Sequence, residues 1–519
     1  MSRAAPPALG VIARRRCCLL LAGLGLGSAP TTATAHTVNT PQFRPRYHFT
    51  PAANWMNDPN GLVFHRGVYH LFFQYHPGSS VWGPMHWGHA TSTDLLRWQE
   101  QPIALRPDAL GMIFSGSAVV DHDNRAGLGP PGSQPLVAMF THHDMAAERA
   151  GRVDRQSQSL AFSLDNGLTW TMHAGNPVIA NPGRQDFRDP KLRWLPERGR
   201  WVAALACGDR IGFYSSADLL DWTAESEFGA GLGAHGGVWE CPDLFPLTGP
   251  DGRERWVLLV SLNPGGPNGG SATQYFIGDF DGRRFRPEHA DTRWLDHGPD
   301  HYAGVTWAGV DDRALLIGWM SNWRYADRVP TAPWRSAMTM PRELTLREAG
   351  GRRLLASQPA REMRALQQPA TLDRRGIDLA QPLDLSAALA GSGGRFVLRL
   401  RGGALRSLTL TLGNAAGDAL LMGYDAATRV WWIDRSASGE LGFHPDFAGR
   451  HTAPRLADSP ATELQLWFDA CSVELFADSG LSNLTSLFFP RQPWSRATLA
   501  SSDGAVLDEL SLRPLGDPG

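Results

Sequence analysis

Lysine is almost absent from this chain of 519 residues: Lys191 is the only one, so nearly all of the 49 basic residues are arginine. Basic and acidic residues also balance, at 49 against 51. Without an excess of either sign, the composition indicates neither an extended basic face for nucleic acid nor an acidic tail. We therefore expect a neutral, polar binding partner and no nucleic acid.

Cysteine is scarce as well. Of the five cysteines, Cys17 and Cys18 stand near the N-terminus, and Cys207, Cys241 and Cys471 are widely dispersed. That number and spacing exclude a disulfide framework and a C-x-x-C metal site. We expect the fold to be stabilised by packing.

The chain also lacks an apolar run long enough to span a bilayer, which takes about 20 residues. Near the N-terminus, Arg14, Arg15 and Arg16 precede a short apolar segment, residues 17–26, and Ala33-Thr34-Ala35 follows before His36. This pattern predicts a signal peptide over residues 1–35, cleaved after an A-x-A site. We expect a secreted or periplasmic protein with no membrane association after cleavage. The arginines permit twin-arginine export, and the choice between that route and the general one stays open.

Short β-rich runs separated by Gly, Pro, Asp and Asn fill the chain from about residue 47 to residue 344. An Asp turn followed by an aromatic residue recurs at roughly 50 to 70 residues, the length of one four-stranded propeller blade. The copies are residues 92–98, 163–170 and 216–222, with a looser one at 279–285. The sequence therefore predicts an all-β fold, with a five-bladed β-propeller over residues 36–345.

A polar, arginine-rich stretch follows, and we expect a linker at residues 346–372. Beyond it, residues 396–400, 408–412 and 464–468 alternate apolar and polar side chains. Such alternation is typical of antiparallel strands with one buried face. Residues 373–519 are therefore predicted to form a β-sandwich with a supporting or accessory role.

Three acidic motifs are candidates for chemistry. Asp58 stands in Trp55-Met56-Asn57-Asp58-Pro59-Asn60-Gly61, Asp189 in Arg188-Asp189-Pro190, and Glu240 in Glu240-Cys241-Pro242. An isolated Asn-Asp-Pro-Asn stretch would be interpreted as an ordinary turn. Three acids beside proline and aromatic residues, each at an apparent strand end, indicate a site instead.

These motifs resemble the signatures of glycoside hydrolase family 32, the β-fructosidases, and they occur in the family's order. The similarity extends through residues 48–51, 114–117, 300–303, 318–323 and 473–476, which is nearly the whole mature chain. It implies a five-bladed propeller with a C-terminal sandwich. It also implies Asp58 as nucleophile, Asp189 as transition-state stabiliser and Glu240 as general acid/base. Retaining glycosidases use such a carboxyl pair, and Arg188 is expected to keep Asp189 anionic.

The resemblance further implies which residues hold one terminal fructose. Sugar pockets combine aromatic faces with amides and hydroxyls. Trp319 and Trp323 compete for one role. His86 and His89 are interpreted as structural histidines, and no metal or cofactor is expected. The expected substrate-binding residues are Asn57, Pro59, Asn60, Gln74, Trp82, Phe114, Ser115, Arg188, Trp319 and Trp323.

The sequence thus predicts a retaining glycosidase that releases terminal β-D-fructofuranose from levan and inulin, and we expect it to act on sucrose as well. Fructosyl transfer and difructose release on the same fold remain alternatives, because they use the same residues. A non-catalytic sugar-binding propeller would lose a carboxylate, and all three are present. A sialidase-like propeller would account for the Asp turn at residues 163–170, but it needs an arginine cluster and a tyrosine nucleophile that these motifs do not supply. The preference among fructans and the oligomeric state are left open.

Overall fold

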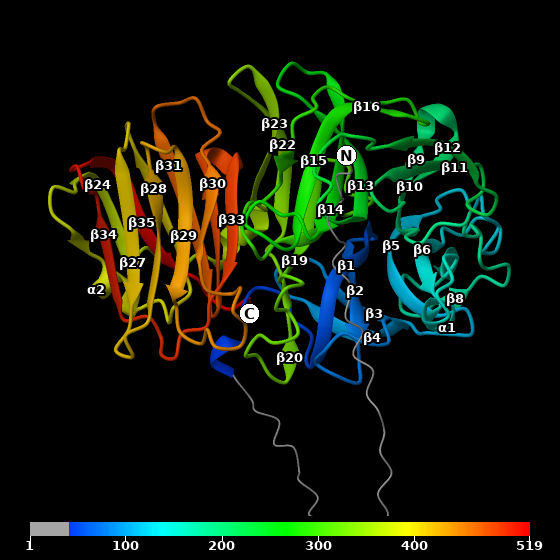
Figure 1. Cartoon of the computed structure of the whole chain (residues 1–519), viewed down its shortest axis with the longest axis horizontal. Coiled ribbons are helices and arrows are strands. Elements are labelled where there is room, and N and C mark those ends of the chain that lie inside the picture. Colours follow the sequence, from blue (N-terminus) through cyan, green and yellow to red (C-terminus); the bar gives the residue numbers. More distant parts are fainter. Residues whose placement is uncertain (1–40, 519) are drawn as a thin grey trace, which may run out of the picture. The chain divides into compact units, whose positions relative to one another are not determined.

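The computed structural model describes residues 41–518, which form an almost entirely β-stranded structure (Figure 1). Within them, five sheets lie between residues 54 and 359, and two six-stranded sheets follow. The predicted all-β fold, a five-bladed propeller followed by a β-sandwich, is confirmed. The predicted signal peptide lies outside the described residues.

Each blade is an antiparallel sheet whose first strand is innermost. The first three blades follow the chain in order, with short helices at two of the connections. Blade 1 comprises β1 (Asn54–His65), β2 (Val68–His76), β3 (His86–Ser92) and β4 (Gln99–Leu105); blade 2 comprises β5 (Met112–Val120), β6 (Leu136–His143), β7 (Gln156–Ser163) and β8 (Thr171–Met172), with α1 (Met145–Arg149); blade 3 comprises β9 (Arg188–Leu195), β10 (Arg200–Ala206), β11 (Ile211–Ser216) and β12 (Thr223–Phe228), with η2 (Pro196–Arg198).

The last two blades complete the ring. Consecutive inner strands β1, β5, β9 and β13 contact one another, and β18 contacts both β13 and β1. A short strand, β20 (Trp334–Arg335), also pairs with the start of β1. Blade 4 comprises β13 (Val238–Thr248), β14 (Glu254–Asn263), β15 (Ala272–Phe280), β16 (Phe285–Pro287) and β17 (Arg293–Trp294); blade 5 comprises β18 (Tyr302–Thr306), β19 (Ala314–Met320), β21 (Ala337–Met338), β22 (Arg342–Ala349) and β23 (Arg352–Pro359).

The recurring Asp turns connect the two outer strands of a blade. In blade 2, Asp165 accepts hydrogen bonds from Ser163 and Thr169, and the indole N–H of Trp170 donates to the carbonyl of Gly167 at 3.1 Å. The copies in blades 1 and 3 make the same contacts. These turns are therefore structural caps, which removes the feature that favoured a sialidase-like site.

The sandwich consists of two sheets whose inner faces share one apolar core. In β27, for example, Leu408, Leu410 and Leu412 point into it, as the alternation predicted. One sheet orders β24 (Leu372–Asp378), β35 (Val506–Pro514), β26 (Phe396–Gly402), β31 (Thr462–Asp469), β32 (Ser472–Ala477) and β33 (Ser482–Leu487); the other orders β25 (Leu383–Asp384), β34 (Arg496–Ala500), β27 (Ser407–Gly413), β28 (Ala419–Asp425), β29 (Val430–Ala437) and β30 (Arg450–Pro454). The remaining helices are η1 (Pro41–Phe43), η3 (Arg361–Leu366), α2 (Ser386–Ala390) and η4 (Asp478–Gly480).

The segment expected as a linker, residues 346–372, is largely regular structure. It contains the end of β22, the whole of β23 and η3. The arginine-rich stretch that suggested a boundary is the hairpin between β22 and β23, where Ala349 pairs with Arg352. The fifth blade therefore extends to Pro359, because its outermost strand needs these residues.

Buried ion pairs join the propeller to the sandwich. Arg342 of β22 donates to Glu474 of β32 at 3.0 Å and to Asp296 at 2.9 Å. His48 bridges Asp469 at 2.9 Å and Glu474 at 2.8 Å. All five side chains are at most 1% exposed. Since removing one partner of such a pair leaves a buried charge, these contacts fix one arrangement of the two parts.

Candidate active site

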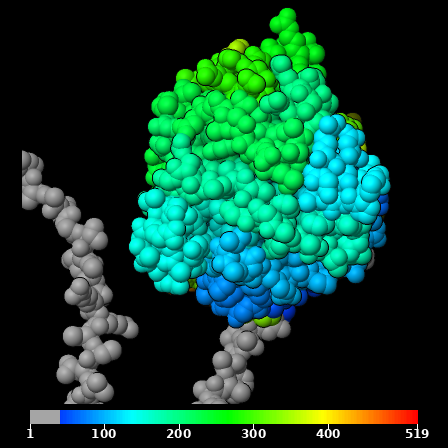
Figure 2. All heavy atoms as spheres, turned by 90° about the vertical axis from the view of Figure 1, so that its right-hand side faces the viewer, coloured from blue at the N-terminus to red at the C-terminus, as the bar shows by residue number. Residues whose placement is uncertain are grey.

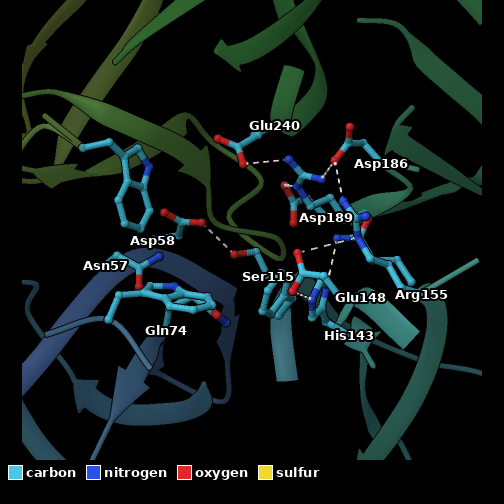
Figure 3. A pocket seen from close by; sticks show the side chains of 15 residues that line it. Asn57, Asp58, Gln74, Ser115, His143, Glu148, Arg155, Asp186, Asp189 and Glu240 are labelled. Atoms are coloured by element: carbon cyan, nitrogen blue, oxygen red, sulfur yellow. Dashed lines mark hydrogen bonds and ion pairs between the residues drawn. The ribbon is translucent and has the colours of Figure 1, made fainter. Parts of the chain in front are cut away.

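A pocket of about 300 Å³ lies where the inner strands of the blades converge (Figure 3). Figure 2 looks onto the propeller, whose blades are coloured blue through green. Polar and aromatic side chains from blades 1 to 5 contribute to the pocket. Its lining is Asn57, Asp58, Gln74, Trp82, Phe114, Ser115, His143, Glu148, Arg155, Gln156, Asp186, Arg188, Asp189, Glu240 and Trp323.

The inner strands become irregular at the height of this pocket. Asp189 and Cys241 adopt left-handed backbone angles, with φ of 60° and 45°. Bulges and such conformations cluster at functional sites, where they redirect side chains that a regular strand would place elsewhere. Register shifts interrupt the pairing between Met56 and Pro59 in β1, Ile113 and Gly116 in β5, Glu240 and Asp243 in β13, and Tyr302 and Val305 in β18.

The carboxyl of Asp58 is held by one of its two oxygens. Oδ2 accepts a hydrogen bond from Ser115 Oγ at 2.7 Å and one from Cys241 Sγ at 3.4 Å. Oδ1 is buried and has no hydrogen-bond partner within residues 41–518. Burial, and then the charge of Glu240, raises the pKa of Asp58, while its hydrogen-bond donors oppose that rise.

Asp189 is anchored to the backbone of the neighbouring blade. Its Oδ2 accepts the N–H of Cys241 at 3.0 Å, and its own N–H donates to Thr141 Oγ1 at 3.0 Å. Burial is the largest influence and raises the pKa of Asp189 to about 7; Arg188 opposes the rise, and the other two carboxylates add to it. Arg188, whose Nε lies 3.9 Å from Asp189 Oδ2, therefore favours the anionic form as expected but offsets the effect of burial only in part.

Glu240 faces the pocket with both carboxyl oxygens engaged. Arg188 Nη2 donates to Oε1 at 3.0 Å, and the hydroxyl of Tyr302 donates to Oε2. Arg188 also pairs with Asp186 at 2.6 Å, and the nearby carboxylates raise the pKa of its guanidinium. Tyr302 belongs to the matching stretch at residues 300–303, but no feature of the sequence assigns it a role.

The predicted substrate-binding residues divide into two groups. Seven line the pocket: Asn57, Gln74, Trp82, Phe114, Ser115, Arg188 and Trp323. Three do not, which corrects the expectation. Pro59 and Asn60 lie below it, where Asn60 Oδ1 accepts from Gln74 Nε2 at 2.8 Å. Trp319 is completely buried behind Trp323, with 4.9 Å between ring centroids.

The outer half of the pocket carries an ionic chain that the sequence did not reveal. Glu148 of α1 contacts His143 at 3.1 Å, and Arg155 lies 3.8 Å from Asp186, which pairs with Arg188. Figure 3 shows these side chains opposite Asn57 and Asp58. Of these residues, Asp186 is the one whose place in the sequence, two residues before Arg188, indicated that it could lie in the site.

Among the described residues, no cluster of His, Cys, Asp and Glu has the arrangement of a metal site. His86 and His89 have separate partners: His86 Nδ1 contacts the carbonyl of Pro84, and His89 Nε2 contacts His70 Nδ1 at 3.1 Å. Over the same part of the chain, no helix has the length and apolar character of a membrane span.

A pocket with one carboxyl that presents a free oxygen, and a second held by arginine and tyrosine, has the groups that two-carboxylate glycoside hydrolysis requires. The fold and the site together define a glycosidase. The family model for the N-terminal domain of glycosyl hydrolases family 32 matches residues 48–359, and the model for the family's C-terminal domain matches residues 362–514. The chain belongs to glycoside hydrolase family 32.

Its relatives include a levanase and extracellular exo-inulinases. The chain is 43% identical to a levanase of Bacillus subtilis over 487 residues, covering 91% of this chain and 70% of the relative. It is 41% identical to an extracellular exo-inulinase of Aspergillus niger over 510 residues, covering 91% and 95%. The crystal structure of an exo-inulinase from Aspergillus awamori superposes with a TM-score of 0.84 at 37% identity, covering 92% of this chain and 98% of that one.

Proposed function

We propose that this glycosidase is a retaining, exo-acting β-fructosidase that releases terminal fructose from levan or inulin, and from sucrose. The observation that carries the proposal is the free Oδ1 of Asp58 in a pocket that Glu240 also lines. The similarity to a levanase and to exo-inulinases supports the substrate class.

In the proposed first step, Asp58 Oδ1 attacks the anomeric carbon of the terminal fructosyl unit, and the bond to the leaving oxygen breaks. Glu240 gives its proton to that oxygen, so the leaving saccharide departs neutral and a fructosyl ester remains on Asp58. Glu240, now a carboxylate, next takes a proton from water, whose oxygen attacks the same carbon while the ester bond to Asp58 breaks. Asp58 is thereby returned to a carboxylate and Glu240 to a protonated carboxyl. Fructose is released with its original anomeric configuration.

The surrounding groups fit supporting roles. Asp189, anchored by the Cys241 N–H, is placed to hold sugar hydroxyls while positive charge develops on the ring. Trp323 gives an apolar wall for the C–H face of the sugar. Gln74 offers its amide oxygen as an acceptor, because its Nε2 already donates to Asn60 and to the carbonyl of Ile113. Asn57, whose amide oxygen accepts the indole N–H of Trp55 at 2.8 Å, has its N–H groups left to donate, and its side chain also helps to stabilise the charged form of Asp58.

Exo-action follows from the shape of the pocket. Below Asp189 the propeller axis retains a cavity of only about 10 Å³, too small for a sugar. A chain must therefore enter by its end. The test is product analysis on levan, inulin and sucrose: we expect fructose from the first minutes and a slow fall in polymer length. Early difructose or longer oligomers with little fructose would refute exo-action, and kestoses from concentrated sucrose would show that transfer prevails over hydrolysis.

We also propose export with cleavage after Ala35. The predicted signal at residues 1–35 and the extracellular relative support it. N-terminal sequencing of protein recovered outside the cytoplasm should start at or near His36. Exported protein that still begins at Met1 would contradict cleavage.

A further inference from the structure

The only lysine of the chain, Lys191, is buried one layer beneath the candidate active site. It lies in β9, two residues after Asp189, and lines the small cavity that closes the pocket from below. A buried ammonium costs solvation free energy unless it is paired and hydrogen-bonded. Its partners therefore indicate why a lysine is kept there.

Lys191 connects the inner strands of three blades. Its Nζ donates to Asp243 Oδ2 of β13 at 3.0 Å and to the carbonyl of Thr306 in β18 at 2.7 Å. The Thr306 hydroxyl lies 3.4 Å away, and the Thr306 N–H also donates to Asp243 Oδ2. The Lys191 ammonium therefore joins β9, β13 and β18 through a triangle of contacts among Lys191, Asp243 and Thr306.

The same three strands carry groups of the site above. Asp189 precedes Lys191 in β9, Glu240 precedes Asp243 in β13, and Tyr302 begins β18 four residues before Thr306. In β13, a register shift lies between Glu240 and Asp243, and in β18 one lies between Tyr302 and Thr306. Because ladder hydrogen bonds are interrupted at a bulge, the spacing of the strands there needs another constraint.

A fourth inner strand, β5, is hydrogen-bonded to β9 on both sides of Lys191. Ser117 of β5 donates to the carbonyl of Pro190 at 2.8 Å and accepts the N–H of Leu192 at 2.8 Å. It stands two residues after Ser115, which holds Asp58. The layer formed by Ser117, Lys191, Asp243 and Thr306 therefore underlies all three carboxylates.

Stability alone does not account for this layer. Buried ion pairs are commonly no more stabilising than apolar side chains of similar volume. Lys191 also has no direct access to substrate, since it is not among the residues that line the pocket and its three hydrogen bonds are made within the layer. The layer instead fixes the distance between neighbouring inner strands at the height where their pairing is irregular.

We propose that Lys191 is a positioning residue that, with Asp243 and Thr306, sets the separation of Asp189, Glu240 and Tyr302. The proposal rests on the β-fructosidase activity proposed above. A displacement of about 1 Å in a catalytic group can lower turnover roughly 10²-fold. A loosened layer should therefore reduce kcat much more than it raises KM.

The main test is the double variant K191M/D243N, which removes both charges and keeps an oxygen that accepts the Thr306 N–H. We expect a folded enzyme whose kcat on sucrose falls about 10- to 100-fold, whose KM changes less than threefold, and whose pH–rate profile is displaced. R455M is the matched control: it breaks a buried ion pair of the sandwich, Arg455–Asp478 at 2.8 Å. R455M should lose thermal stability and keep its kcat. A folded double variant with kcat within threefold of the parent would overturn the proposal.

Ser117→Ala provides a second test if the double variant does not fold, because it removes a tie of the same layer without exposing a buried charge. We expect kcat to fall about tenfold at an unchanged KM. An unchanged kcat would count against positioning by the layer.

Amine acylation offers a direct readout on the parent enzyme, since Lys191 carries its only ε-amino group. Mass spectrometry after treatment with acetic anhydride should find Lys191 unmodified in the native enzyme. In increasing urea, its modification should parallel the loss of turnover. An enzyme acylated at Lys191 that retains turnover would refute the proposal. If the parent itself hydrolyses no fructoside, the proposed function fails instead, a result that the activity assay of the parent separates from the variants.

Discussion

Replacing Ser115 with alanine tests how the candidate nucleophile is kept ionised. The Ser115 hydroxyl donates to Asp58 Oδ2 at 2.7 Å in a buried site. A hydrogen bond to a carboxylate stabilises its charged form and so lowers its pKa. Burial already raises the pKa of Asp58, and losing this donor should raise it further. Because the nucleophile must be ionised, the acidic limb of kcat/KM should move to higher pH.

The size of the shift follows from the bond that is lost. A hydrogen bond to a charged group contributes about 1.5–3 kcal/mol, and one pKa unit corresponds to about 1.4 kcal/mol. A loss of about 2 kcal/mol therefore moves the limb by about 1.5 units and lowers kcat/KM roughly 30-fold on that limb. Above the limb, where Asp58 is ionised in both proteins, the two rates should converge.

The assay is kcat/KM for fructose release from pH 3.5 to 8. Ser159→Ala is a matched control, since Ser159 is buried in the same blade and its hydroxyl contacts His142 Nδ1 at 2.7 Å, away from the pocket. The control should keep the parent profile. A Ser115→Ala enzyme whose activity falls equally at every pH, with the limb unmoved, would refute the reasoning.

Three further predictions address the other charged groups. Asp58→Asn should remove nearly all turnover without changing the fold, because it is almost isosteric and cannot form the ester; activity within tenfold of the parent would contradict its role. Glu240→Ala should impair substrates with poor leaving groups most, and azide should restore the second step; equal losses on activated and natural substrates would exclude acid catalysis. The two carboxylate partners of His48 raise its pKa to about 9, although burial opposes this rise. Protonated His48 should therefore stabilise the fold by about 3 kcal/mol, fully below about pH 6.5. This contribution should be lost as the pH rises through 9. Urea unfolding at pH 6.5 and 9.5 should show the difference in the parent and not in His48→Gln.

Much of the fold could be predicted because it is encoded locally. The Asp turns that cap the outer hairpins of blades 1 to 3 recur in the sequence at the spacing of a blade, and β27 alternates with the period of a half-buried strand. The boundary at residues 346–372 was harder to predict. A polar hairpin and a polar linker have the same composition, and pairing with β22 is what makes residues 352–359 a strand.

The residues of the candidate site that stand in the three acidic motifs could be predicted from the sequence. Asp58, Asp189 and Glu240 stand in distinctive stretches, and all three line the pocket. Tyr302, which contacts Glu240, and Glu148, which contacts His143, lie outside the three acidic motifs, and no local pattern distinguishes them. Trp319 and Trp323 have equal claims by sequence, and only the packing of one behind the other separates them. The raised pKa of Asp189 likewise depends on burial shared with distant residues.

The ring of inner strands also determines when the enzyme can become active. A nascent chain that has completed four blades already contains Asp58, Asp189 and Glu240, yet it lacks Tyr302 and Trp323, which belong to the fifth-blade region. It also lacks Thr306, the group that completes the contacts of Lys191. Turnover therefore cannot build up blade by blade. The first catalytic event marks the docking of the last blade against the first, so activity in this protein reports that the ring of inner strands has closed.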